Sequence, residues 1–492
     1  MSATRLVLLL VLIAAPLLPA SAKTESQRGA ARQAAPFGRA AGALVPAHAT
    51  AALLLDGATG AAGLRQLLTA AAGLAPSLSP EDNGATLASE VSVDLLDAGS
   101  APAAGLASSG PRALVIDGDA TGLSAPVADA ASAQRALEAW IGQAGELRPT
   151  RPPPFKGPLA AGDGAHLRAG MLAPVAGGLR LLTASGRGAT LLVAALAHVG
   201  ARKSDTPHLA LSPSIASALS AAHGPAILWL HGSGPVLGAV LSLDASKSGL
   251  VASGLALPAG KAVLLSGAAP EQDCGQALAC TRVSLGPAAL PLLSRVAREL
   301  VDSAVPDSGR AIFEHLLERA LLATTGPAAL RIDSLDVQAL GHAHGLPGAL
   351  SFLARGAAKS VSLVPPVPTP ASLAALANGA AVQGRHGLCL QSASGIISLG
   401  APCPAAAPAP LAPGKDSDLL LDARFNTATL AGELRTLSPI DALRGQAAAG
   451  AFAAQLLWGE LLANSGPITA EGRRVASSPG QIALTVRWPL GR

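Results

Sequence analysis

The scarcity of aromatic residues is the feature that most limits how this chain can fold. Half of its 492 residues are hydrophobic, yet aromatic residues make up 2 % and tyrosine is missing altogether. A chain this hydrophobic can build a core and is not expected to be disordered throughout. That core must be packed mainly from leucine, valine and alanine. Because small side chains bury less area each, we expect modest stability per residue.

The same composition argues against nucleic acid as a partner. Proteins that bind single strands stack the bases on aromatic side chains, which are scarce here. The formal net charge is only +4, and the sequence has no run of lysine or arginine that could follow a phosphate backbone.

The first 22 residues have the pattern of a secretory signal peptide. Arg5 precedes an apolar run over 6–18, and Ala20, Ser21 and Ala22 form a small-residue cleavage site. The run is shorter than the roughly 20 residues that a membrane-spanning helix needs, and no cysteine follows it for lipid attachment. We therefore expect a periplasmic or secreted protein that is not a lipoprotein and whose mature chain has no transmembrane segment. The small, polar residues 23–43 predict a disordered lead-in.

The four cysteines predict two local disulfides. Cys274 lies close to Cys280, and Cys389 lies close to Cys403, so proximity favours these two pairs over the other connectivities. An exported protein meets oxidising conditions, and loop closure would stabilise each pair by about 2–3 kcal/mol. Neither pair has the Cys-x-x-Cys spacing of a zinc site.

Three proline-rich stretches interrupt the chain, at 149–158, 364–370 and 402–413. Proline removes a backbone donor and disfavours helix in the residue before it, so these stretches are linkers between domains or long loops within one fold. Taken as boundaries, the first two divide the chain into three units. These are 44–150, 159–363 with a helical pair over 288–323, and 371–492.

A strand–helix–strand pattern recurs along the chain. Short apolar strands are predicted at 51–57, 226–232 and 418–423. After helical sequence, Gly-Pro turns lead into further strands at 109–117, 325–333 and 465–470. Amphipathic helices are predicted at 288–304, 311–323 and 448–463, strands at 178–183 and 481–487, and a hairpin at 389–403. The fold class expected is α+β, with antiparallel sheets, amphipathic helices packed on one face, and repeated strand–helix–strand units.

His231 gives the sharpest enzymatic hypothesis. The segment 227–235 resembles the strand-to-loop His-Gly region that supplies oxyanion-hole donors in α/β-hydrolases. That fold also needs a Gly-x-Ser-x-Gly nucleophile elbow, which the sequence lacks. The segment 254–261 resembles a phosphate-binding loop, but five residues separate its glycines where four are needed, and Ala262 replaces the serine or threonine that binds magnesium.

Other polar residues do not form a recognisable site. His342 and His344 could pair on a metal, with His386 and Asp333 as further ligands, but no spacing brings them together, so we assign no metal site. At predicted strand ends lie three aspartates, Asp56, Asp117 and Asp422. Such residues usually bond turn backbone, so we assign them no catalytic role.

Several segments together resemble a family of bacterial exported proteins of unknown function. Residues 45–57 are similar to its opening, in which a proline precedes an apolar strand that ends in aspartate. Residues 123–129, followed by a helix to Trp140, and residues 178–185 are similar to later steps. The similar segments are scattered over about half the chain. The resemblance implies an α+β envelope protein and no catalytic residues. This chain departs from the family in its cysteine pairs and its high alanine and glycine content.

The sequence thus predicts a non-catalytic exported envelope protein that binds a partner protein or an apolar ligand and has no cofactor. This is a prediction by elimination, because no nucleophile elbow, phosphate loop, acid pair or metal cluster is recognisable. An apolar groove between a sheet and its leucine-lined helices could hold a lipid-like ligand. The alternative is an α/β-hydrolase-like esterase that uses His231, so whether the protein is an enzyme stays open.

Overall fold

The structure is a computed structural model. It describes residues 37–149, 157–175, 178–201, 207–232, 236–260, 263–271, 273–289, 326–334, 349–355, 382–383, 389–393, 396–401, 411–412, 414–440, 443, 446–476, 478 and 480–490. The predicted signal peptide, most of the lead-in, the helical pair over 288–323, and the residues His342, His344, His386 and Cys403 lie outside this set, wholly or nearly so.

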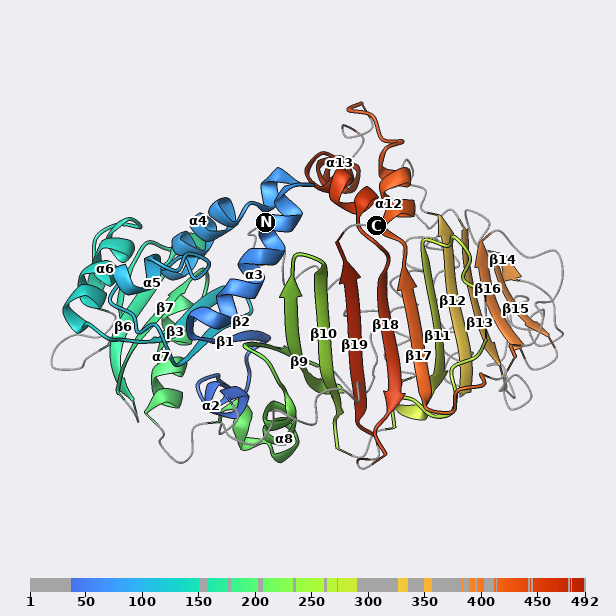
Figure 1. Cartoon of the computed structure of the whole chain (residues 1–492), viewed down its shortest axis with the longest axis horizontal. Helices are drawn as coiled ribbons and strands as arrows, with labels where there is room; N and C mark the ends of the chain where they lie inside the picture. The colour runs from blue at the N-terminus through green and yellow to red at the C-terminus, as the bar shows by residue number, and fades with distance from the viewer. Residues whose placement is uncertain are drawn as a thin grey trace, which may run out of the picture. The chain divides into compact units, whose positions relative to one another are not determined.

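The chain divides into two compact units. Unit 1 runs to Leu257, leaving out Ser233–Leu237, and unit 2 begins at Pro258. Both units combine helices with antiparallel strands, as the α+β prediction requires. Figure 1 shows unit 1 in blue to green, and the described strands of unit 2 in yellow-green to red.

Unit 1 contains the helices and strands that surround the candidate site. Its helices are α2 (Phe37–Gly42), α3 (Gly57–Ala72), α4 (Pro80–Val91), α5 (Ser100–Ala103), α6 (Ala130–Gly142), α7 (Ala189–Gly200) and α8 (Pro213–Ala221). Its strands are β1 (Ala51–Asp56), β2 (Pro111–Asp117), β3 (Ala120–Pro126), β4 (Arg148–Pro149), β5 (Leu159–Ala161), β6 (Arg168–Val175), β7 (Gly178–Ser185), β8 (Ala226–His231), β9 (Val236–Ser246) and β10 (Gly249–Pro258). Short 3₁₀ turns are η3 (Pro76–Leu78), η4 (Gly164–His166) and η5 (Leu209–Leu211).

These strands form one sheet, in the order β10–β9–β8–β1–β2–β3–β7–β6–β5–β4. Every pair for which a register is defined is antiparallel. Because β3 and β6 both pair with β7, segments more than 40 residues apart in sequence lie side by side at this end of the sheet.

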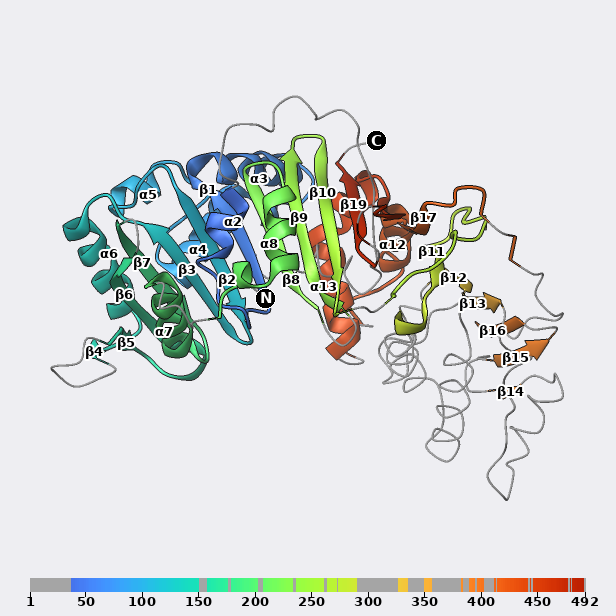
Figure 2. The same cartoon turned by 90° about the horizontal axis from the view of Figure 1, so that it is seen from below.

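Helices cover both faces of the unit 1 sheet, which corrects the expectation of a single covered face. A Cβ on Gly170 would lie 2.5 Å from Leu137 of α6, and a Cβ on Gly122 would lie 2.9 Å from Leu192 of α7. The two glycines pair with consecutive residues of β7. Consecutive strand residues point to opposite faces, so α6 and α7 pack on opposite sides. Figure 2 shows α7 in front of these strands, with α6 beyond β6.

The same rule places the other helices of unit 1. A Cβ on Gly60 of α3 would meet Leu55, whereas one on Gly38 of α2 would meet Ile227, which pairs with Leu54 on the opposite face. Helices α3, α4 and α6 thus lie on one side of the sheet, and α2, α7 and α8 lie on the other. Both sides of the core are built from fully buried aliphatic side chains. Among the largest of these are Leu54, Leu123, Leu137, Ile141, Leu181, Leu192, Leu196 and Ile227.

Local sequence signals determine where α4 and α6 begin. Ser79 caps α4 by accepting a hydrogen bond from the backbone N–H of Asp82 at 3.0 Å, and Pro80 occupies the first turn. Asp129 caps α6 by accepting bonds from the N–H groups of Ala131 and Ser132. A cap of this kind satisfies donors that the first helical turn leaves unpaired.

Unit 2 is also built on an antiparallel sheet. Its strands are β11 (Ala279–Leu285), β12 (Gly326–Ser334), β13 (Ala349–Arg355), β14 (Val382–Gln383), β15 (Cys389–Ala393), β16 (Ile396–Ala401), β17 (Leu419–Phe425), β18 (Ile468–Arg474) and β19 (Ile482–Pro489). They follow the order β19–β18–β17–β11–β12–β13–β16–β15–β14. The 3₁₀ turn η6 (Pro287–Ala289) follows β11, and the helices α12 (Thr427–Leu434) and α13 (Gln446–Asn464) follow β17.

One predicted strand–helix–strand assignment needs correction. In the described part of the chain, the element that follows β8 is its antiparallel neighbour β9, which begins at Val236. The Gly-Pro pair at 326–327 instead opens β12, which pairs with β11. The other two assignments are consistent with the structure, because β1 pairs with β2 and β17 pairs with β18.

The first proline-rich stretch joins two paired strands of unit 1 and is not the boundary between the two units. Arg148 and Pro149 of β4 pair with Ala160 and Leu159 of β5, so the stretch between them connects two paired strands. The boundary between the two compact units lies at Leu257 and Pro258. Whether 44–150 folds on its own stays a prediction.

The predicted disulfide between Cys274 and Cys280 is confirmed. The two sulfur atoms lie 2.04 Å apart and the Cα atoms 5.6 Å apart. The predicted hairpin around Cys389 is also present as β15 and β16, but the pairing of Cys389 with Cys403 lies outside the described residues. None of the helices in the described part of the chain is long and apolar enough to span a membrane.

Candidate functional site

A polar cleft in unit 1 is the best candidate for a functional site. It has a volume of about 690 Å³, which falls within the range typical of small-molecule sites. Twelve residues line it, namely Ser89, Glu90, Asp119, Thr121, Gln143, Ala144, Ala165, His166, Arg168, Ser185, Gly186 and Arg187. Hydroxyl, amide and charged side chains predominate, and none of these residues has a large aliphatic side chain.

The floor of the cleft is one row of side chains across three strands. Ser185 of β7 pairs with Thr121 of β3 on one side and with Arg168 of β6 on the other. Directly paired residues of antiparallel strands point to the same face. The register therefore places two hydroxyl groups and one guanidinium side by side, on the face that α4 and α6 cover.

The ends of α4 and α6 form the walls, and hydrogen bonds fix them to the sheet. The hydroxyl of Thr183 donates to the carbonyl of Val91 at 2.8 Å, and the indole N–H of Trp140 donates to the carbonyl of Ser89 at 3.0 Å. Each bond satisfies a carbonyl that the last turn of α4 leaves unpaired. Glu90, which lies between these two anchored residues, is thereby held at the edge of the cleft.

Arg168 is partly committed to a structural role. Its Nη1 donates to the carbonyl of Trp140 at 2.7 Å and to Oε1 of Gln143 at 2.8 Å, and its guanidinium lies 5.0 Å from the centre of the Trp140 ring. A cation at this position stabilises the C-terminal end of α6. Burial lowers the pKa of Arg168 from its ordinary value. The remaining donors of the guanidinium are not used in these contacts.

Four other ionisable side chains in the cleft have no partner among the described residues. No ion pair or side-chain hydrogen bond joins Glu90, Asp119, His166 and Arg187 to one another or to Arg168. Oε2 of Glu90 is buried and has no hydrogen-bond partner. A buried carboxylate oxygen without a donor is costly, so a bound cationic or N–H group would remove that cost.

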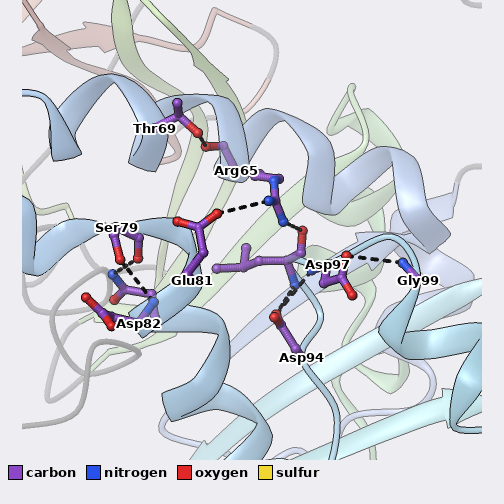
Figure 3. Close-up of polar contacts among 10 residues, drawn as sticks. Arg65, Thr69, Ser79, Glu81, Asp82, Asp94, Asp97 and Gly99 are labelled. Carbon is purple, nitrogen blue, oxygen red and sulfur yellow. Dashed lines mark hydrogen bonds and ion pairs between the residues drawn. The ribbon is translucent and has the colours of Figure 1, made fainter.

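A nearby acidic cluster behaves differently, because its members are already bonded. Figure 3 shows Arg65 of α3 bridging the carbonyl of Leu96, at 2.9 Å, and Glu81, at 3.1 Å. Asp94 accepts bonds from the backbone N–H groups of Leu96 and Asp97. These contacts connect α3, α4 and the segment that follows α4, which explains the acids as structural.

His231 lies at the exposed end of β8, away from the lining residues. Its backbone N–H donates to the carbonyl of Thr50 at 2.9 Å, and its ring makes an edge contact with Trp229 at 6.3 Å between centroids. No serine hydroxyl bonds the imidazole in the described part of the chain, and Ser233 lies outside that part. The esterase hypothesis stays a prediction.

The aspartates at strand ends do not converge. Asp117 lies 3.3 Å from His48, and Asp422 pairs with Arg282. Asp56 is the residue before α3 but makes no side-chain cap. Asp333 pairs with Arg331 at 2.6 Å. Among the described residues, no three histidine, cysteine, aspartate or glutamate side chains are grouped so that they could hold a metal.

The glycine-rich segment at 254–261 is mostly strand. Gly254 belongs to β10, where a Cβ would clash with the backbone of Val240 and Leu241. The glycine thus allows close approach between β9 and β10, which agrees with the rejection of a phosphate loop.

The comparisons with known proteins give no relative. The chain matches no protein-family model, no curated protein and no solved structure. The cleft therefore has to be interpreted from its own chemistry. Sequence reasoning missed it because Thr121, Arg168 and Ser185 carry no local motif. Thr121 and Arg168 lie at the start of β3 and β6, and Ser185 lies at the end of β7. Of these three strands, only the one at 178–183 was predicted.

Proposed function

We propose that this chain is a non-catalytic exported protein that binds a small, polar, ionic ligand in the cleft of unit 1. The observation that carries the proposal is the convergence of unpaired ionisable side chains on one cleft, with a buried oxygen of Glu90 left without a donor. The lining favours an ionic ligand over the apolar one expected from composition. Binding of a partner protein remains compatible with the rest of the surface.

The absence of an assembled nucleophile supports a binding role over catalysis. Acyl transfer needs a hydroxyl or thiol within hydrogen-bond reach of a base that a third group orients. In the described cleft, no hydrogen bond joins the hydroxyl of Ser89, Thr121 or Ser185 to His166.

Export to the periplasm or beyond follows from the predicted signal peptide and the resemblance to exported proteins. The disulfide between Cys274 and Cys280 supports it, because such bonds persist in oxidising compartments.

We further propose that the two units are copies of one ancestral strand pattern. When the nine strands of unit 1 other than β4 are numbered in chain order, and the nine strands of unit 2 are numbered in the same way, the two sheets have the same strand order. In both sheets it is nine, eight, seven, one, two, three, six, five, four. In both units, Gly-Pro lies at the start of the second strand. Strands β8 and β17 hold equivalent places, and β1 corresponds to β11.

Ligand-observed NMR with the mature protein tests the proposed function. The probe is a mixture of amino acids, organic acids, amines, neutral sugars and decanoate, and the test variant is Glu90→Gln/His166→Ala/Arg187→Ala. We expect at least one of the amino acids, organic acids or amines to bind the wild type and not the triple variant. The variant Arg135→Ala/Glu138→Gln, on the exposed surface of α6, is the matched control and should bind normally.

Two results would contradict the proposed function. One is that none of the amino acids, organic acids or amines in the mixture binds the wild type. The other is that decanoate binds best and that the triple variant retains its binding, which would point to an apolar site elsewhere.

A further inference from the structure

The charges of the cleft are divided between its walls, and this division limits the ligand. Glu90 lies in the last turn of α4, where the helix dipole adds partial negative charge. Its carboxylate is the acidic group on this side of the cleft. The cleft can thus hold a cationic group at the end of α4.

The opposite side of the cleft is predominantly basic. Arg187 lies in the turn between β7 and α7, and His166 is the last residue of η4. The two segments are adjacent, because the N–H of Gly186 donates to the carbonyl of Leu167 at 2.9 Å. Asp119 lies in the turn beside them, since a Cβ on Gly186 would clash with its carbonyl. Together with Arg168 on the floor, this side of the cleft has three basic side chains and one carboxylate, that of Asp119.

A ligand of single charge would leave one side of this cleft unmatched. An anion could bind Arg187 and His166, but it would leave Oε2 of Glu90 without a donor. A cation could satisfy Glu90 but would meet the basic side chains. Charge-assisted hydrogen bonds to both sides require opposite charges on one molecule.

From this arrangement, we infer that the ligand is a zwitterion whose ammonium group binds Glu90 and whose carboxylate group binds Arg187. The cleft volume of about 690 Å³ accommodates charges separated by several bonds, as in an ω-amino acid or a short peptide. This inference rests on the proposed function and specifies its ligand class.

Calorimetric titration of the mature protein with three matched probes tests the inference at pH 7.5. The probes are 6-aminohexanoate, hexanoate and hexylamine, which share one carbon chain and differ in charge. We expect 6-aminohexanoate to bind at least about tenfold more tightly than either singly charged probe, because only it makes both charge-assisted contacts.

Two substitutions assign the ends of the ligand. Glu90→Gln keeps the side-chain shape and should weaken 6-aminohexanoate about tenfold while leaving hexanoate within about twofold. Arg187→Ala changes an exposed residue and should weaken 6-aminohexanoate and hexanoate alike. Glu138→Gln is the control, and a matching melting temperature shows that each variant is folded.

The outcomes separate the two proposals. If hexanoate binds as tightly as 6-aminohexanoate, or if Glu90→Gln leaves the zwitterion unaffected, the zwitterion inference is wrong and the proposed ionic site survives. If none of the three probes binds and the NMR mixture also gives no ligand, both proposals fail.

Discussion

Arg180 is a buried cation whose described partners are all neutral. Its Nε donates to the hydroxyl of Ser124 at 2.9 Å, and its Nη2 donates to the carbonyls of Pro111 at 2.6 Å and Ser124 at 2.9 Å. Burial lowers its pKa to about 10. The side chain joins β7, β3 and the start of β2, so it fixes the position of these three strands.

We expect Arg180→Ala to lower the free energy of unfolding by about 2–4 kcal/mol, because it leaves a cavity and removes three hydrogen bonds. Arg180→Lys should lie between the alanine variant and the wild type, since one ammonium cannot reproduce the planar fork. Urea titration measures both. An alanine variant as stable as the wild type would mean that the cost of burying the charge offsets all three bonds.

Ser92, which follows α4, has the left-handed backbone conformation that favours glycine. Its φ is +75°, and its hydroxyl is buried without a hydrogen-bond partner. We expect Ser92→Gly to raise the free energy of unfolding by about 1 kcal/mol, because glycine adopts this conformation without strain. Ser92→Ala removes the hydroxyl but keeps the strain, so the difference between the two variants in urea titration isolates the backbone contribution. Equal stability of the two would contradict a backbone effect.

For single residues, the sequence predicted a contact between neighbours in the chain but not the grouping of residues far apart in it. The spacing of Cys274 and Cys280 was enough to predict their bond, because the chain itself brings them together. The cleft residues Thr121, Arg168 and Ser185 are brought together only by strand register. No local pattern contains that register, so the site could not be predicted.

Among the elements, α6 offers a test through its N-cap. The pKa of Asp129 is lowered by the side-chain hydrogen bond from Ser132, by the backbone bond from the same residue and by that from Ala131. A lowered carboxyl pKa contributes stability that is present above the ordinary value near 3.8 and is lost as pH falls through the folded value.

We therefore expect Asp129→Asn to melt slightly below the wild type at pH 7, because asparagine is a good cap but carries no charge. The difference in melting temperature should begin to shrink as pH falls below about 4 and continue to shrink as pH falls through the lowered pKa of the folded state. Thermal denaturation monitored by circular dichroism across pH 3–7 measures it. A difference that stays constant over this range would show that the charge of Asp129 contributes nothing.

Elements were predicted more reliably than their arrangement. The strands at Ala51–Asp56, Gly178–Ser185 and Leu419–Phe425 were identified from apolar runs and turn residues. The hairpin that Ala226–His231 forms with β9 was not identified, because an apolar run does not specify whether a helix or a second strand comes next. The two covered faces were not predicted either. The available signal was the pair of adjacent residues Leu181 and Leu182 in β7, which point to opposite sides and are both buried.

At the scale of the whole molecule, the disulfide between Cys274 and Cys280 lies in unit 2. Closing the short loop between Cys274 and Cys280 should stabilise that unit by about 2 kcal/mol. We expect mild reduction to lower the melting temperature of unit 2 and to leave that of unit 1, over residues 37–257, unchanged. Differential scanning calorimetry with and without reductant measures both. The variant Cys274→Ala/Cys280→Ala should reproduce the reduced state, and an equal shift of both transitions would show that the units unfold as one.

The row formed by Thr121, Ser185 and Arg168 has a consequence for how the cleft can change over evolutionary time. Its three members are held in line by residue counts between turns, so substitutions elsewhere in β3, β6 and β7 leave the row intact. Loss or gain of one residue within β7 would move Ser185 off this face and bring Ala184 or Gly186 into line. The cleft is therefore inherited as a set of strand lengths, and single-residue insertions and deletions are the changes that would abolish it.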